Sequence, residues 1–157
     1  MSEDADSMSE EHGTRVLHGG GPLGRAAPKM LPKLPAACFV QATDLKDAVR
    51  QAAEDGVIQL ILFATAESLD QADVQAPLAE ITTDMGGSPL RAAETGSIRA
   101  AYEQWDEAGL LGKCGRELCR RVADDLERTA GAAFAAQVVL LDPAAERMIG
   151  MYGRLRR

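Results

Sequence analysis

The stretch VIQLILFA, residues 57–64, is apolar at almost every position. Side chains of a strand point alternately to the two faces of its sheet, so an uninterrupted apolar run must be covered on both faces. The stretch therefore predicts a central strand of a layered sheet, with helices packed on either side.

The residues before this stretch predict another strand and a helix. The run AACFVQA, residues 36–42, is short and apolar, and Thr43 or Asp44 after it can cap a helix. Apolar residues within 45–52 recur at spacings of three and four, and Gly56 can end the helix in a left-handed conformation. Two strands joined by a single helix predict parallel pairing between them.

A helical region is predicted after the central strand. Ser68 and Gln71 have the spacing of a capping box. Pro77 suits the first turn of a new helix, and it is equally compatible with a kink in one continuous helix. Apolar residues within 78–85 then recur on one side.

The remainder of the chain predicts two helices and a hairpin. Apolar residues recur with helical spacing over 98–108 and again over 113–130. The apolar segment 136–141 is followed by a turn and by a returning strand over 147–154. The whole pattern predicts the α/β class.

Length and composition predict a single domain with an N-terminal arm. The chain has 157 residues, enough for one packed domain, which we place at 36–157. Residues 1–13 are acidic and are expected to be disordered. Residues 19–35 are rich in glycine and proline, so residues 1–35 together are expected to form a flexible arm.

The net charge of −7 lacks the basic field of a nucleic-acid-binding protein. The polar N-terminus does not resemble a secretory signal, and no apolar run approaches the roughly 20 residues that span a bilayer. We therefore expect a cytoplasmic protein that binds neither nucleic acid nor membrane. The odd number of cysteines, three, favours reduced thiols over a disulfide framework.

The predicted order of elements resembles the thioredoxin fold. LILFA, residues 60–64, is similar to the central strand of that family, and APLAEI, residues 76–81, is similar to its long active-site helix. The Cys-x-x-Cys motif of the family would fall within 67–73, where there is no cysteine. The family's cis-proline is also missing near 135–136, the terminal helix is absent, and a helical pair is inserted before the hairpin.

This resemblance implies a redox-silent, non-catalytic factor for binding, assembly or chaperoning, with a protein partner, a possible homodimer and no cofactor. Its binding surface would lie after the central strand, where ligands bind in open parallel sheets. The residues are Thr65, Glu67, Ser68 and Asp70, joined by Trp105. The first four also suit helix capping, and Trp105 also suits the core or a subunit contact.

Cys114 supports an alternative, a thiol-based redox enzyme or sensor. It lies beside Lys113 and near Arg116 at a predicted helix N-terminus, surroundings that lower a thiol pKa. Cys119 is expected in the core. Five residues apart on one helix, the two thiols are rotated by about 140°, which disfavours a shared disulfide or metal. No metal site is expected, because His12 and His18 have no recognised ligand spacing with these cysteines.

A second alternative is a small nucleotide-binding α/β protein. GGGPLG, residues 19–24, fits the pattern G-x-G-x-x-G, and Asp44 lies where a ribose-binding acid would follow. That motif needs a helix directly after it, and Pro22 and Pro28 oppose one. We therefore favour a flexible linker here, with His18 solvated. The basic C-terminal end is expected to be a solvated tail or a contact for an acidic surface; it comprises Arg147, Arg154, Arg156 and Arg157.

Overall fold

The computed structural model describes residues 13–87 and 97–153 and has an α/β architecture, as predicted. Its sheet has the order β2-β1-β3-β4-β5, with parallel pairing except between β4 and β5. The strands are β1 (Thr14–His18), β2 (Phe39–Gln41), β3 (Gln59–Ala64), β4 (Ala135–Leu141) and β5 (Met148–Gly153). The helices are α2 (Pro22–Met30), α3 (Leu45–Glu54), α4 (Ala66–Gln71), α5 (Leu78–Asp84), α7 (Ile98–Glu107) and α8 (Leu111–Thr129), with a short 3-10 turn, η1 (Ala36–Cys38).

Strand β3 is the central strand that the apolar stretch predicts. All six of its residues are buried, and it pairs in parallel with β1 on one side and β4 on the other. Its side chains divide between two hydrophobic clusters. Leu60 and Leu62 belong to one, and Ile61 and Phe63 belong to the other.

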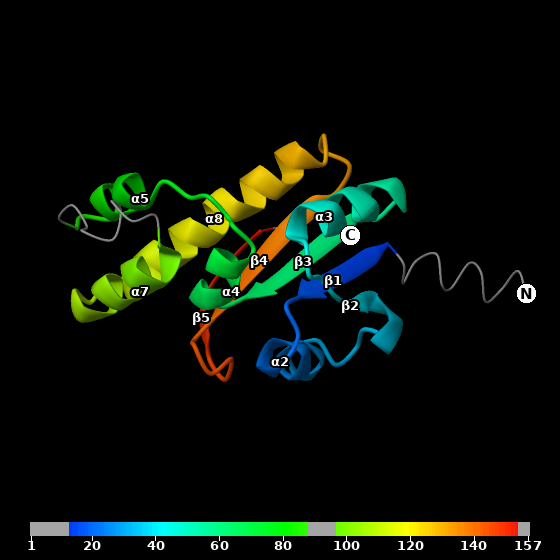
Figure 1. Ribbon diagram of the computed structural model, residues 1–157, viewed down its shortest axis with the longest axis horizontal. Helices are drawn as coiled ribbons and strands as arrows, with labels where there is room; N and C mark the ends of the chain where they lie inside the picture. Colours follow the sequence, from blue (N-terminus) through cyan, green and yellow to red (C-terminus); the bar gives the residue numbers. More distant parts are fainter. Residues whose placement is uncertain (1–12, 88–96, 154–157) are drawn as a thin grey trace, which may run out of the picture.

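The two faces of the sheet are covered unequally (Figure 1). Helix α2 packs on one face through Leu23 and Ala27, against the cluster that contains Phe63. Helices α3, α4, α5, α7 and α8 all contribute to the cluster on the other face. The connections that follow β1 and β2 therefore leave the sheet on opposite faces.

The predicted pairing of residues 36–42 with the central strand is wrong. Strand β1 lies between them, because Val16 pairs with both Phe39 of β2 and Ile61 of β3. Helix α3 therefore crosses over β1 on its way from β2 to β3. Five residues of mixed polarity, TRVLH, form β1, too short a run to stand out as a strand in the sequence.

The predicted flexible linker over residues 19–35 is also wrong, because α2 occupies much of it. Pro22 stands in the first turn, where a helix needs no N–H donor. Pro28 lies inside the helix but faces solvent, while Leu23, Ala26 and Ala27 are buried against the sheet. Residues 14–30 thus belong to the same sheet and core as the rest, and the prediction for residues 1–12 lies outside the described part of the chain.

Helices α7 and α8 and the β4–β5 hairpin confirm the corresponding predictions. The capping box pairs Thr65 with Ser68, one turn earlier than the expected Ser68–Gln71 pair. Pro77 precedes α5 and is followed by a new helix, separate from α4. No helix within the described ranges combines the length and the apolar character needed to cross a membrane.

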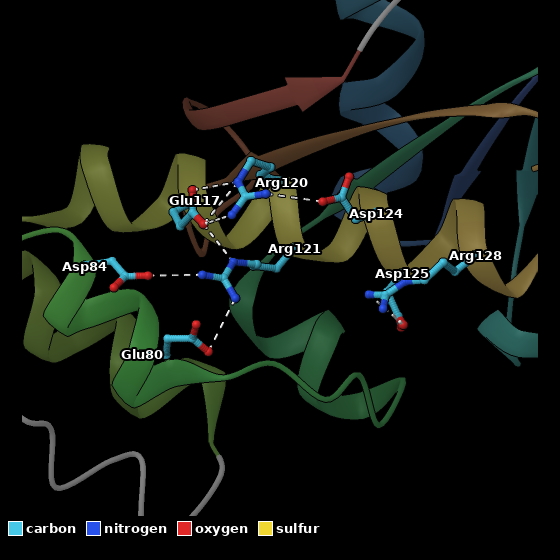
Figure 2. A network of polar contacts seen from close by, with 8 residues as sticks. All are labelled: Glu80, Asp84, Glu117, Arg120, Arg121, Asp124, Asp125 and Arg128. Atoms are coloured by element: carbon cyan, nitrogen blue, oxygen red, sulfur yellow. Dashed lines mark hydrogen bonds and ion pairs between the residues drawn. The ribbon is translucent and has the colours of Figure 1, made fainter.

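An ion-pair network joins α8 to α5 (Figure 2). Glu117 accepts hydrogen bonds from Arg120 and, at 2.7 Å, from Nε of Arg121. The Arg121 guanidinium also reaches Asp84 at 3.2 Å and Glu80 at 3.5 Å on α5. Hydrogen bonds from Arg120 and Arg121 lower the pKa of Glu117 to about 2.

We expect Glu117 to make the protein sensitive to acid. Its pKa is 4.5 when unperturbed and about 2 in the folded state. Its stabilising contribution is therefore complete above about pH 4.5 and is lost as the pH falls toward 2. We expect this contribution to be about 1–3 kcal/mol, since Glu117 is mostly buried but partly screened by solvent. Urea unfolding at pH 7 and pH 3 measures it, and Glu117→Gln should abolish that part of the pH dependence.

The exposed pair Asp125–Arg128, with its atoms 4.0 Å apart, provides the matched control. Asp125→Asn should change the free energy of unfolding by less than about 0.5 kcal/mol. Equal effects of Glu117→Gln and Asp125→Asn would contradict a special role for the network.

Candidate functional site

The carboxyl ends of β1 and β3 form the candidate site. The chain leaves β1 toward α2 on one face and leaves β3 toward α4 on the other. A point where neighbouring connections diverge in this way is where open α/β sheets bind ligands. The two connections meet, because a Cβ placed on Gly19 would lie 4.0 Å from Cβ of Ser68.

A loop of three glycines, Gly19–Gly21, joins β1 to α2. Gly20 has φ +87° and Gly21 has φ +58°, which L side chains rarely adopt. A Cβ on Gly20 would also lie 2.5 Å from Nε2 of Gln41, whereas one on Gly21 would meet nothing within 4 Å. The loop is thus packed against the end of β2 on one side and open on the other.

Helix α2 begins directly after this loop, so the structural context that the glycine motif requires is present. Its first intrahelical bond runs from the Arg25 N–H to the Gly21 carbonyl. The N–H groups of Leu23 and Gly24 precede that bond and have no acceptor within the helix. Such groups attract negatively charged ligand atoms.

His18 holds the glycine loop in place and is not the solvated side chain that we expected. Its Nδ1 accepts a hydrogen bond from the Gly20 N–H at 3.0 Å. The ring lies against Gly24, where an added Cβ would stand 3.1 Å from Cε1. Burial lowers the pKa of His18, so the ring is neutral at pH 7 and carries its proton on Nε2. His18 thus positions the loop and offers one donor beside it.

Asp44 follows the carboxyl end of β2, at the same end of the parallel strands as the glycine loop. Its Oδ1 accepts a hydrogen bond from the Asp47 N–H at 3.1 Å and so caps α3. The side chain is exposed, and β2 lies beside β1. An acid at this place in a nucleotide-binding fold accepts hydrogen bonds from ribose hydroxyls.

The predicted binding residues after β3 mainly serve helix ends. Thr65 and Ser68 cap α4 reciprocally, with bonds of 3.1 Å and 2.9 Å. Glu67 is exposed in the first turn of α4. Asp70 accepts hydrogen bonds from the N–H groups of Ile98 and Arg99 at 2.8 and 2.9 Å, which fastens the start of α7 to α4. Ser68 also lies next to the glycine loop, through its Cβ near Gly19.

Trp105 is not part of any surface. Its side chain is fully buried in the main hydrophobic cluster. The indole Nε1–H donates to Oγ1 of Thr82 at 2.8 Å, and Thr82 donates in turn to the Leu78 carbonyl at 2.7 Å. The expected contribution of Trp105 to binding is therefore wrong, while the alternative role in the core is confirmed.

The expected lowered pKa of Cys114 is wrong. Cys114 is buried, and burial raises the pKa of its thiol. Cys119 is buried as expected, and burial raises its pKa to about 12. Both thiols point into the core because the inward face of α8 packs on the sheet. Within the described ranges, His, Cys, Asp and Glu form no group that could hold a metal ion.

Comparison with known proteins gives three curated relatives. The chain is 36% identical over 161 residues to a protein of Salinispora tropica, 34% over 164 residues to one of Salinispora arenicola, and 37% over 147 residues to one of Rubrobacter xylanophilus. All three are named cobalt-precorrin-5B C(1)-methyltransferase. No family model and no solved structure matches the chain.

The similarity covers most of this chain but a smaller part of its relatives. The matches include 90%, 92% and 82% of the chain, which spans only 42%, 42% and 37% of the relatives' lengths. All three relatives bear the name of an enzyme. The prediction of a non-catalytic thioredoxin-like binding, assembly or chaperone factor is therefore wrong.

Proposed function

We propose that this chain binds a methyl donor at the glycine loop and takes part in methyl transfer to C1 of a cobalt-precorrin. The observation that carries the proposal is the identity of 34–37% with three methyltransferases over 82–92% of the chain. S-adenosylmethionine, the common biological methyl donor, combines an adenosine with an amino-acid carboxylate, and both parts have counterparts in this site.

The geometry at the carboxyl ends of β1 and β2 supports a donor of this kind. The free N–H groups of Leu23 and Gly24 suit its carboxylate, and Asp44 suits its ribose hydroxyls. In the transfer, an electron pair of the acceptor carbon forms the new carbon–carbon bond. The methyl–sulfur bond breaks, its electron pair stays on sulfur as a thioether, and the acceptor, which takes up the positive charge, releases a proton to solvent. The residues of this chain contribute by orienting the two reactants, which is a large part of catalysis in bimolecular reactions.

Isothermal titration of the full chain with S-adenosylhomocysteine tests the donor site. We expect Gly20→Ala to weaken binding about tenfold or more, because an added Cβ strains φ +87° and displaces Gln41. Gly56→Ala is the matched control. Gly56 has φ +79° but precedes β3, at the amino ends of the parallel strands and so at the opposite end from the glycine loop. It should lower the melting temperature without changing binding. Absence of binding to the unaltered chain would contradict the proposed donor site.

His18 provides a pH readout for the same experiment. Because its pKa lies below the ordinary value of 6.5, the loop-holding neutral form dominates at pH 7 and is lost as the pH falls. Binding should therefore weaken as the pH falls below the ordinary histidine value of 6.5. In His18→Asn, Oδ1 can replace Nδ1 as the acceptor for Gly20, so binding should persist without this pH dependence, whereas His18→Ala should weaken binding at every pH.

Methyl transfer itself is tested with S-adenosylmethionine and cobalt-precorrin-5B. The expected result is a product whose mass has increased by one methyl group in place of a hydrogen. A chain that neither binds the donor analogue nor yields this product does not have the proposed function.

A further inference from the structure

A groove of about 450 Å³ lies between α2 and the turn that joins β4 to β5. One side is formed by residues of α2, and the other is the turn at residues 144–146. Alanines line both sides: Ala26 is on the helix, and Ala144 and Ala145 are on the turn. Its lining residues are Pro22, Arg25, Ala26, Lys29, Met30, Ala144, Ala145 and Glu146.

The charges of the groove favour an anionic ligand. Arg25 and Lys29 are exposed, and their i,i+4 spacing puts both on the same side of α2. In the part of the chain that the structure describes, neither Arg25 nor Lys29 forms an ion pair with a carboxylate within 4.0 Å. Glu146 is the single acid among the lining residues, so the two cations leave the groove with a net positive charge.

Apolar groups complete the groove. Met30, at the end of α2, has 37% of its surface exposed. The flexible, polarisable side chain of methionine adapts to flat conjugated ligands. Unpaired cations beside small apolar side chains match a macrocycle with an apolar body and carboxylates on its rim.

The groove also adjoins the proposed donor site. Pro22 lines the groove and directly follows the glycine loop at Gly19–Gly21. A ligand in the groove would thus lie beside α2, next to the glycine loop that we assign to the donor. Two neighbouring sites of this kind are what a reaction between two bound substrates needs.

We propose that this groove binds the carboxylate rim of the tetrapyrrole methyl acceptor, with Arg25 and Lys29 as its carboxylate-binding residues. This inference rests on the proposed function, since it assigns the second substrate of the same reaction. The bound part is one edge of the macrocycle, because a groove of about 450 Å³ is at the lower end of the range for sites that enclose a whole ligand.

The test is a fluorescence titration of the full chain with uroporphyrin, a tetrapyrrole whose rim carries carboxylates. We expect the double variant Arg25→Gln/Lys29→Gln to weaken binding about tenfold or more, because it removes two charge-assisted contacts. The matched control is Lys46→Gln/Arg50→Gln, which removes the same charge at the same spacing from α3. The control should bind uroporphyrin as the unaltered chain does. All these residues are exposed, and melting temperatures confirm that both variants fold.

Three results would overturn the inference: no binding of uroporphyrin to the unaltered chain, no loss of binding in the α2 variant, or equal losses in the α2 and α3 variants. The third would mean general attraction by positive charge. None of these results bears on the glycine loop, so titration with S-adenosylhomocysteine still decides the donor site separately. Loss of donor binding with retained, Arg25-dependent uroporphyrin binding would instead contradict only the donor site.

Discussion

Replacing Trp105 with alanine is expected to destabilise the protein by about 3–5 kcal/mol. The side chain is fully buried among residues of α5, α7, α8 and the sheet, so its removal leaves a large cavity. It also leaves the buried hydroxyl of Thr82 without its donor, since the two side chains share a hydrogen bond of 2.8 Å. Urea unfolding followed by far-UV circular dichroism measures the loss.

Two further variants separate packing from hydrogen bonding at this position. Thr82→Val keeps the indole in place but removes its acceptor, and should cost about 1–3 kcal/mol. Trp105→Phe removes the donor and part of the volume, so its cost should lie between those of Thr82→Val and Trp105→Ala. If Trp105→Ala cost less than about 1 kcal/mol, typical of an exposed position, the burial described here would be wrong.

Replacing Gly150 with valine should have the second largest effect, a destabilisation of about 3 kcal/mol. A Cβ at Gly150 would stand 3.0 Å from the backbone nitrogen of Arg116 and 3.1 Å from the carbonyl carbon of Gly115. Both atoms belong to the backbone of α8, which cannot rotate away as a side chain can. The substitution must therefore shift the backbone of α8 away from β5, and thermal unfolding should show the loss of stability directly.

Gly112, on α8, is the control for Gly150, which lies on β5. A Cβ at Gly112 would meet nothing within 4 Å. Gly112→Ala should therefore stabilise the protein by about 0.5–1 kcal/mol, through the higher helix propensity of alanine. A Gly150→Val variant as stable as the unaltered chain would contradict the close approach of α8 to the sheet.

Local patterns predicted the elements that have long apolar periodicity. Residues 57–64 predicted a strand buried on both faces, and β3 is buried at all six positions. The helical spacing over 98–108 and 113–130 corresponds to α7 and α8, and the hairpin was visible in its two apolar runs. These predictions succeeded because burial of a face leaves its period in the sequence.

The N-terminal part was mispredicted because its evidence is not local. The proline and glycine content of residues 19–35 indicated a linker, yet the sheet supplies the buried surface that keeps α2 helical. Placing β1 between β2 and β3 also required pairing partners that the short strand does not specify. The sequence favours a linker over a ligand site at the glycine loop and His18 for the same reason, since Thr14–His18 is too short to establish a strand and the prolines oppose a helix after it.

The sequence by itself determined the α/β class, the central strand and the helical pair before the hairpin, because each follows from the hydrophobic period of one continuous segment. Only the tertiary structure decided which polar and aromatic side chains are buried and which face solvent. It placed Trp105 and Cys114 in the core, joined Asp70 to the start of α7, and brought His18, Gly20 and Gln41 together. The physical reason is that such contacts join segments far apart in the chain, and strand order, which no local pattern encodes, sets their distances.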